Sequence, residues 1–109
     1  MKRGDVYWYK FRPPDKRRPV LVLTRNSAIP LLVSITIAPL TTRIRDIASE
    51  VLLTPEEDGV AEVCVVNTDN IQTIEKERLE SFITKLSPSR MHEIMEAIKF
   101  SLGSDAIEE

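Results

Sequence analysis

The sequence predicts a mainly β fold, a small β-barrel or curled β-sheet, with one helix packed on its outside. Two observations support this fold class. Short runs rich in Val, Ile, Tyr and Phe alternate with turn residues from residue 4 to residue 74. After residue 87 the apolar residues recur every three or four positions, which is typical of an amphipathic helix. The length of 109 residues, 42% of them apolar and 29% charged, predicts a single domain over 1–109.

The first two strands are expected over residues 4–11 and 20–23. The first is rich in aromatic and β-branched side chains, and we expect Trp8 to pack in the core. The second is a continuous apolar run, which is typical of a strand buried on both faces. Pro13 and Pro14 favour a loop between them, because proline cannot donate to a sheet ladder.

Further strands are expected over residues 31–38, 47–53, 60–66 and 71–74. Asn26, Ser27 and Pro30 mark the first connection, and the polar turn 67–70 marks the last. The segment 56–59 reads Glu-Glu-Asp-Gly, and we interpret it as a solvated acidic turn.

The predicted helix has a start signal and a stop signal. Ser87 is a favourable N-cap, and Pro88 suits the first helical position. Gly103 supplies the stop, and the acidic tail of residues 104–109 is expected to be frayed. One apolar stripe is formed by Met91, Ile94, Met95, Ile98 and Leu102.

The charges divide unevenly along the chain. Residues 1–45 contain ten Lys and Arg and two Asp, a sum of +8. Residues 46–109 contain five Lys and Arg and fifteen Asp and Glu, a sum of −10. A basic first part is typical of a surface that binds polyanions, although the charges of the two parts can also mix in space.

Several classes of site are excluded or disfavoured. One Cys cannot form an internal disulfide or a Cys-based zinc site, and one His cannot form a two-His acid–base pair. Cys64 is expected to be a buried, inert thiol and His92 a surface residue. We expect no metal and no cofactor. The chain has no apolar run of about 18 residues and enters a strand pattern at once, so we expect no membrane span, no signal peptide and a cytoplasmic location.

The remaining candidates are arginines and threonines. Lys16, Arg17 and Arg18 lead into the second strand, and Thr41, Thr42 and Arg43 follow the third. An arginine can bind a phosphate through two parallel hydrogen bonds, and a threonine hydroxyl can donate to a phosphate oxygen. This combination suits a phosphodiester that is stabilised by charge.

Four segments together resemble the MazF/PemK-like toxins of bacterial toxin–antitoxin modules. They are the opening Lys-Arg-Gly-Asp-Val-Tyr-Trp (2–8), Arg-Pro-Val-Leu-Val-Leu (18–23), Ile-Ala-Pro-Leu-Thr-Thr (37–42) and Val-Asn-Thr-Asp-Asn-Ile-Gln-Thr-Ile (66–74). The resemblance implies a small SH3-like (CcdB/PemK-like) β-barrel, a homodimer, and sequence-specific cleavage of single-stranded RNA. Two departures are the short loop with Pro13 and Pro14 and the acidic second part.

The resemblance also implies roles for single residues. Arg18 and Thr41 take the catalytic positions, and Asp69 and Asn70 fall where the family contacts RNA bases. The RNA-binding set is completed by Lys16, Arg17, Thr42 and Arg43. The implied partner is a cognate, MazE-like antitoxin, and we expect its acidic C-terminal segment to compete for the basic surface.

RNA cleavage without a metal requires attack by the ribose 2′-OH, which gives a 2′,3′-cyclic phosphate and a 5′-OH. Arg18 suits the stabilisation of charge, because a guanidinium keeps its proton near neutral pH and is therefore a poor proton carrier. Two alternatives remain. One is a gyrase-poisoning toxin of similar fold, which relies on a Trp-Gly-Ile ending where this chain has Ile107, Glu108 and Glu109. The other is a non-catalytic SH3-like module that binds nucleic acid.

Overall fold

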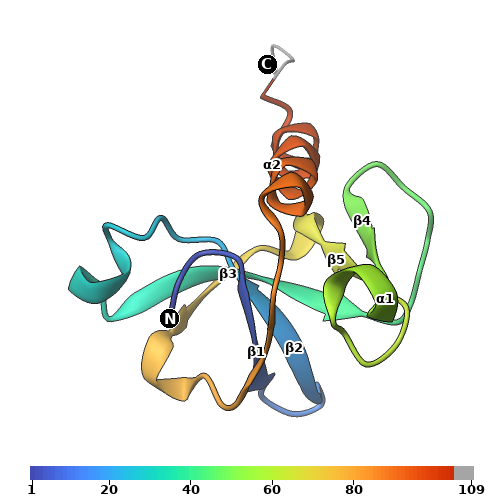
Figure 1. The fold of residues 1–109 in the computed structure, drawn as a ribbon. Helices are drawn as coiled ribbons and strands as arrows, with labels where there is room; N and C mark the ends of the chain where they lie inside the picture. The colour runs from blue at the N-terminus through green and yellow to red at the C-terminus, as the bar shows by residue number, and fades with distance from the viewer. Residues whose placement is uncertain (105–109) are drawn as a thin grey trace.

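The computed structural model describes residues 1–104 (Figure 1). Over this range a curled antiparallel sheet is covered at one end by a long helix. The strands are β1 Asp5–Lys10, β2 Arg17–Val22, β3 Ser34–Thr41, β4 Glu50–Leu53, β5 Cys64–Asn67, β6 Gln72–Glu75 and β7 Phe82–Lys85. The helices are η1 Ile29–Leu31, α1 Pro55–Asp58, η2 Thr68–Asn70, η3 Lys76–Arg78 and α2 Pro88–Leu102. The predicted frayed tail falls mostly on residues 105–109, outside the described range.

Strand β3 is the centre of the sheet. The strand order is β4-β5-β3-β2-β1-β7, and β6 also pairs with β3. The first half of β3, Ser34–Ile37, pairs with β6, whereas Leu40 and Thr41 pair with β5. Since one strand serves two partners in succession, the sheet curls, and the predicted mainly β fold with a C-terminal helix is confirmed.

Strand β2 is buried on both faces, as its apolar run predicts. Leu21 belongs to the cluster that α2 covers, together with Ile94 and Ala97. Val20 and Val22 point the other way, into a second cluster with Tyr9 and Ile37. The barrel interior and the helix interface are therefore separate apolar layers on either side of one strand.

Helix α2 begins and ends where the sequence predicts. The Ser87 hydroxyl accepts a hydrogen bond from the Arg90 amide (3.1 Å), and Gly103 ends the helix with φ 69°. Ile94 and Ile98 of the predicted stripe are buried, but Leu102 is 70% exposed because the last turn extends past the sheet. No helix among residues 1–104 combines the length and apolar character needed to cross a membrane.

The strand boundaries differ from prediction in the middle of the chain. Strand β3 begins at Ser34 rather than residue 31, because Pro30 lies in the 3₁₀ turn η1. Strands β4 and β5 are shorter than expected and begin at Glu50 and Cys64. Strand β7 was not predicted from the sequence. It forms by antiparallel pairing with β1, which is distant in the sequence.

Two expectations about side chains are wrong. Trp8 is only partly buried and lies outside the core clusters, with the guanidinium carbon of Arg17 4.3 Å from its ring centroid. Tyr9 is the aromatic residue that strand alternation turns inward. The expected acidic turn is instead the one-turn helix α1, in which Asp58 is buried and paired with Arg90.

The expectations for Cys64 and His92 hold in their environments. Cys64 is buried in β5, and burial, with the nearby charges of Asp58 and Glu62, raises its pKa to about 11. The thiol is therefore protonated and inert near neutral pH. His92 is exposed on α2.

Candidate functional site

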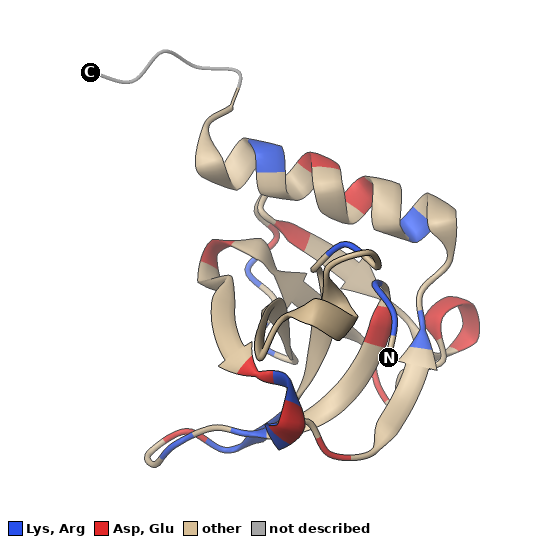
Figure 2. Ribbon diagram, turned by 90° about the vertical axis from the view of Figure 1, so that its left-hand side faces the viewer, with Lys and Arg blue, Asp and Glu red and all other residues tan. Residues whose placement is uncertain are grey.

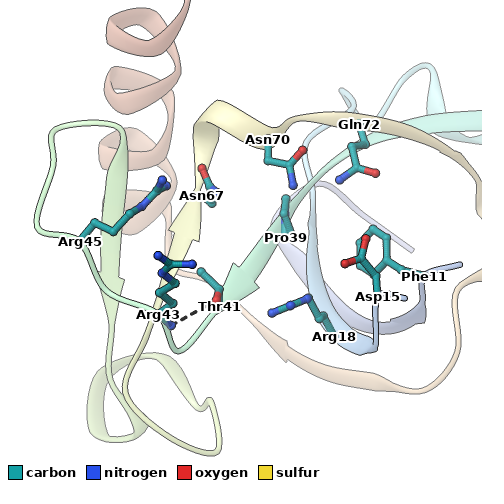
Figure 3. A pocket seen from close by; sticks show the side chains of 10 residues that line it. All are labelled: Phe11, Asp15, Arg18, Pro39, Thr41, Arg43, Arg45, Asn67, Asn70 and Gln72. Atoms are coloured by element: carbon teal, nitrogen blue, oxygen red, sulfur yellow. Dashed lines mark hydrogen bonds between the residues drawn. The ribbon is translucent and has the colours of Figure 1, made fainter. Parts of the chain in front are cut away.

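A polar pocket of about 280 Å³ opens between the ends of β2 and β3 and the segment that follows β5 (Figure 3). This pocket is called the Arg18 pocket below. It lies toward the β1–β2 connection, whereas α2 covers the opposite end of the molecule (Figure 1). Its lining residues are Phe11, Asp15, Arg18, Pro39, Thr41, Arg43, Arg45, Asn67, Asn70 and Gln72.

Arg18 and Thr41 meet because β2 and β3 are antiparallel neighbours. Val20 of β2 pairs with Pro39 of β3. Continuing two residues along each strand in the same register places Arg18 opposite Thr41. A step of two residues keeps both side chains on the same face of the sheet. In Figure 3 the guanidinium of Arg18 points toward Thr41 and Arg43. Among residues 1–104 no carboxylate lies within ion-pair distance of Arg18, so its charge is available to a ligand.

The Thr41 hydroxyl is held in a defined orientation. Its oxygen accepts a hydrogen bond from the Arg43 backbone N–H at 3.2 Å (Figure 3). Because the oxygen acts as acceptor there, its own hydrogen remains free to donate. This geometry suits donation to an anionic oxygen placed between Thr41 and Arg18.

The β3–β4 loop, residues 42–49, brings two more cations to the pocket. Arg45 donates from its backbone N–H and from Nε to the carboxylate of Glu50, each at 2.8 Å. Burial alone raises the pKa of Glu50, but the hydrogen bonds and charge of Arg45 and a backbone hydrogen bond from Asp46 outweigh it and lower that pKa. Glu50 is therefore ionised and offsets the charge of Arg45, whereas Arg18 and Arg43 have no acidic partner among residues 1–104.

Amide side chains form the opposite wall of the pocket. The side-chain oxygen of Asn67, Oδ1, accepts a hydrogen bond from the Asp69 backbone N–H at 3.0 Å, which leaves the side-chain amino group of Asn67 as a donor. Asn70 and Gln72 extend toward the same space (Figure 3). Asp69 is exposed and outside the lining, and its carboxylate accepts a hydrogen bond from the Ser49 hydroxyl.

Four of the eight predicted site residues line the pocket: Arg18, Thr41, Arg43 and Asn70. The other four lie nearby. Arg17 points to the other face of β2, where it stacks on Trp8 and pairs with Glu80 (Nε–Oε1 2.6 Å). Lys16 is exposed in the β1–β2 connection. Thr42 lines a small apolar pocket beside Trp8 on the far side of Thr41.

Six lining residues are outside the predicted site set: Phe11, Asp15, Pro39, Arg45, Asn67 and Gln72. Asn67 and Gln72 carry a usable signal, since each is a polar residue next to a predicted apolar strand. Phe11 and Asp15 carry none, because only the folding back of β1 onto β2 brings them beside Arg18. No cluster of three or more His, Cys, Asp or Glu suited to a metal ion occurs within residues 1–104.

The charge division seen in the sequence is partly preserved in space. Figure 2 shows Lys and Arg positions along the β1–β2 connection, together with a smaller number of acidic ones, and Arg18, Arg43 and Arg45 line the adjacent pocket. Asp58, Glu57 and Glu93 are instead engaged with Arg90 at the other end. Part of the acidic excess of residues 46–109 therefore lies away from the Arg18 pocket.

Comparison with known proteins gives consistent matches over nearly the whole chain. A probable endoribonuclease MazF2 of Mycobacterium tuberculosis is 39% identical over 103 residues, which cover 94% of this chain and 99% of that protein. A probable endoribonuclease MazF5 of the same species is 37% identical and covers 92% of this chain and 91% of its own length.

Solved structures agree with the sequence relatives. The Mycobacterium tuberculosis toxin MazF-mt6 superposes with a TM-score of 0.82 at 35% identity and covers 91% of this chain and 96% of its own. A mycobacterial endoribonuclease in complex with its cognate antitoxin gives 0.82 at 28% identity, with 94% and 95% covered. The expected CcdB/PemK-like barrel is thereby confirmed.

The family described as "PemK-like, MazF-like toxin of type II toxin-antitoxin system" matches residues 2–102. With the curled sheet, the outer helix and the order of the four motifs in agreement, this chain belongs to the PemK-like, MazF-like toxins of type II toxin–antitoxin systems.

Proposed function

We propose that this chain is the toxin of a toxin–antitoxin module and acts as a sequence-specific endoribonuclease on single-stranded RNA, mRNA included, in the cytoplasm. The observation that carries the proposal is Arg18 facing Thr41 across a pocket, free of any acidic partner among the described residues. The names of the relatives support the same reaction.

In the proposed reaction the ribose 2′-OH attacks the adjacent phosphorus, and the P–O5′ bond breaks. Arg18 stabilises the extra negative charge on the phosphoryl oxygens, and Thr41 donates its hydroxyl hydrogen to one of them. The products are a 2′,3′-cyclic phosphate and a 5′-OH. Because the arginines supply the positive charge that the phosphoryl group develops, this reaction needs no metal ion.

Proton removal from the 2′-OH requires an acceptor, and Arg18 is unsuited to this role. Asp15 is the carboxylate that lines the Arg18 pocket within the described chain. We assign it as the candidate proton acceptor, with the leaving 5′ oxygen protonated from water. Lys16, Arg17, Thr42, Arg43 and Asp69 remain proposed RNA contacts, and Asn70 a proposed base contact.

Two protein partners belong to the proposal. The first is a second copy of this chain, because large apolar side chains such as Leu31 (83% exposed) and Val33 (70% exposed) lie open at the surface. Light scattering should give twice the chain mass of 12.4 kDa, and a monomer would contradict the dimer.

The second partner is a cognate antitoxin, since one similar structure is an endoribonuclease in complex with its own. Its acidic segment would occupy the basic pocket in place of RNA. Titration of the antitoxin against toxin bound to a non-cleavable RNA tests this. Mutual exclusion that weakens with salt is expected, and simultaneous binding with unchanged affinities would contradict it.

A labelled single-stranded RNA incubated with the protein in EDTA tests the activity. Cleavage to cyclic-phosphate ends is the expected result. Binding without cleavage would favour the non-catalytic module. Trapping of DNA gyrase without RNA cleavage would favour the gyrase poison, whose characteristic ending corresponds to residues 107–109, outside the described range.

A further inference from the structure

Glu50 connects the buried interior to the wall of the Arg18 pocket. It is the first residue of β4, and its side chain is only 1% exposed. One carboxylate oxygen accepts from the Arg45 backbone N–H and the other from Arg45 Nε, each at 2.8 Å. A single buried carboxylate thus holds both the backbone and the side chain of Arg45 in the β3–β4 loop.

The loop conformation depends on this contact. Asp46 has φ 56°, and it is the one non-glycine residue with positive φ between residues 1 and 104. Asp adopts the left-handed region more readily than most residues with a Cβ, and the contacts around Asp46 keep it there. Before this residue the Glu50 carboxylate accepts from the Arg45 backbone N–H, and after it the Glu50 backbone N–H donates to the Ile47 carbonyl oxygen at 2.9 Å. Contacts of Glu50 on both sides of Asp46 thus favour that conformation.

The same contact determines which part of Arg45 faces the pocket. Because Nε is engaged by Glu50, the two terminal amino groups have no partner among residues 1–104 and are open to a ligand. Figure 3 shows the Arg45 guanidinium directed toward Asn67 at the pocket wall. Because the guanidinium is planar, fixing its Nε also fixes the direction of its two terminal amino groups. Both can then bind a phosphate with little further loss of side-chain freedom.

We propose that Glu50 is a positioning residue, which orders the β3–β4 loop and directs Arg45 to bind an RNA phosphate beside the one that is cleaved. This inference rests on the proposed function and names a further part of its site. An ion pair between a surface arginine and a glutamate usually adds little to the stability of a protein. Here the Glu50 side chain is buried, and both of its carboxylate oxygens accept hydrogen bonds from the same loop. The arrangement therefore serves the loop more than the stability of the sheet.

The test uses Glu50→Gln, Arg45→Gln and the double variant, with Glu93→Gln as the matched control. Glu93 also pairs with an arginine, Arg90, but Arg90 does not line the Arg18 pocket, whereas Arg45, the partner of Glu50, does. Binding is measured with a single-stranded RNA made non-cleavable by a 2′-deoxy sugar at the cut position. Circular dichroism checks the fold of each variant.

We expect Glu50→Gln and Arg45→Gln each to weaken binding about tenfold, the double variant to be no weaker, and Glu93→Gln to bind like wild type. The slope of log K against log salt should fall by about 0.7 in both single variants, as for one lost phosphate contact on a single strand. In the free protein, the chemical shift of the Arg45 Nε–H should move in Glu50→Gln to the value of a solvent-exposed arginine.

If Glu50→Gln fails to fold, Arg45→Lys tests the same claim. This variant keeps the positive charge and the hydrogen bond from the backbone N–H of residue 45 to Glu50, but it removes the planar guanidinium. Loss of binding in Arg45→Lys supports the inference, and unchanged binding overturns it. Equal or tighter RNA binding by a folded Glu50→Gln would also overturn it while leaving the proposed function intact. Failure of wild type to bind or cleave RNA would overturn both.

Discussion

Asp58 and Arg90 form a buried two-bond ion pair that joins helix α1 to the first turn of helix α2. The Nε and Nη2 atoms of Arg90 donate to the two Asp58 oxygens at 2.9 and 3.1 Å. The hydrogen bond and charge of Asp58 raise the pKa of Arg90, so the guanidinium keeps its positive charge. Since Asp58 also accepts from the Thr54 backbone N–H at 2.9 Å, one carboxylate organises both helix starts.

Replacing Asp58 should therefore destabilise the fold. Asp58→Asn leaves Arg90 partly buried with only Glu57 and Glu93, so we expect the free energy of unfolding to fall by about 3 kcal/mol. Urea denaturation measures this change. Glu96→Gln, which breaks an exposed pair with Lys99, should change it by less than about 0.5 kcal/mol. Equal small effects would contradict a structural role for the pair.

The orientation of the Thr41 hydroxyl predicts a specific loss of activity. Thr41→Val removes the hydroxyl but keeps the β-branched shape, so cleavage should fall about 10- to 150-fold, the range for a lost hydrogen bond to a charged group. Thr41→Ser should retain most activity. Thr73→Val is the matched control, since Thr73 is exposed on β6 and does not line the Arg18 pocket. Rate constants for a single RNA substrate would decide, and equal losses at both threonines would contradict the assignment.

The lowered pKa of Glu50 predicts loss of stability in acid. In the unfolded chain Glu50 takes up its proton near its ordinary pKa of 4.5, whereas the folded protein holds it ionised to lower pH. The unfolded state then binds more protons, so the free energy of unfolding falls as the pH drops below about 4.5. Urea midpoints measured from pH 6 to 3 should decline less in Glu50→Gln. Parallel curves would show that Glu50 contributes nothing.

The buried thiol of Cys64 predicts slow alkylation and weaker stability in alkali. Because its pKa is raised from 9.0 to about 11, unfolding above pH 9 releases a proton that the folded state retains. Stability contributed by this group is thus lost as the pH rises from 9 to 11. At pH 8, a thiol reagent should react with Cys64 only at urea concentrations that unfold the chain. Rapid reaction of the native protein would contradict the buried position.

The parts of the fold that depend on local signals could be predicted. Helix α2 carries both of its caps, Ser87 and Gly103, within its own sequence, and the continuous apolar run of β2 indicates burial on both faces. Strand β7 and the position of Trp8 could not be predicted, because each depends on a partner distant in sequence. β7 is a strand because it pairs with β1, and Trp8 is only partly buried, with the Arg17 guanidinium stacked on its ring.

The same distinction applies to the site. Arg18 and Thr41 could be identified because Arg18 begins, and Thr41 lies near the end of, a segment that resembles the family's motifs. Antiparallel pairing places the start of β2 beside the end of β3. Asn67 and Gln72 join them only because β3 pairs with β5 and β6 in succession. The role of Glu50 was not foreseen, since nothing local shows that its carboxylate is buried and turned toward Arg45.

Cleavage of one RNA by Arg18→Ala and Arg17→Ala, compared with wild type in EDTA, tests the central claim most directly. The two arginines are neighbours, but Arg18 faces the pocket and Arg17 covers Trp8 on the other face. We expect Arg18→Ala to lose about 10²–10³ in kcat, as for a lost oxyanion donor, with unchanged urea stability, and Arg17→Ala to stay within about tenfold of wild type. Near-normal cleavage by a folded Arg18→Ala, or a larger loss in Arg17→Ala, would contradict the assignment of the Arg18 pocket as the cleavage site.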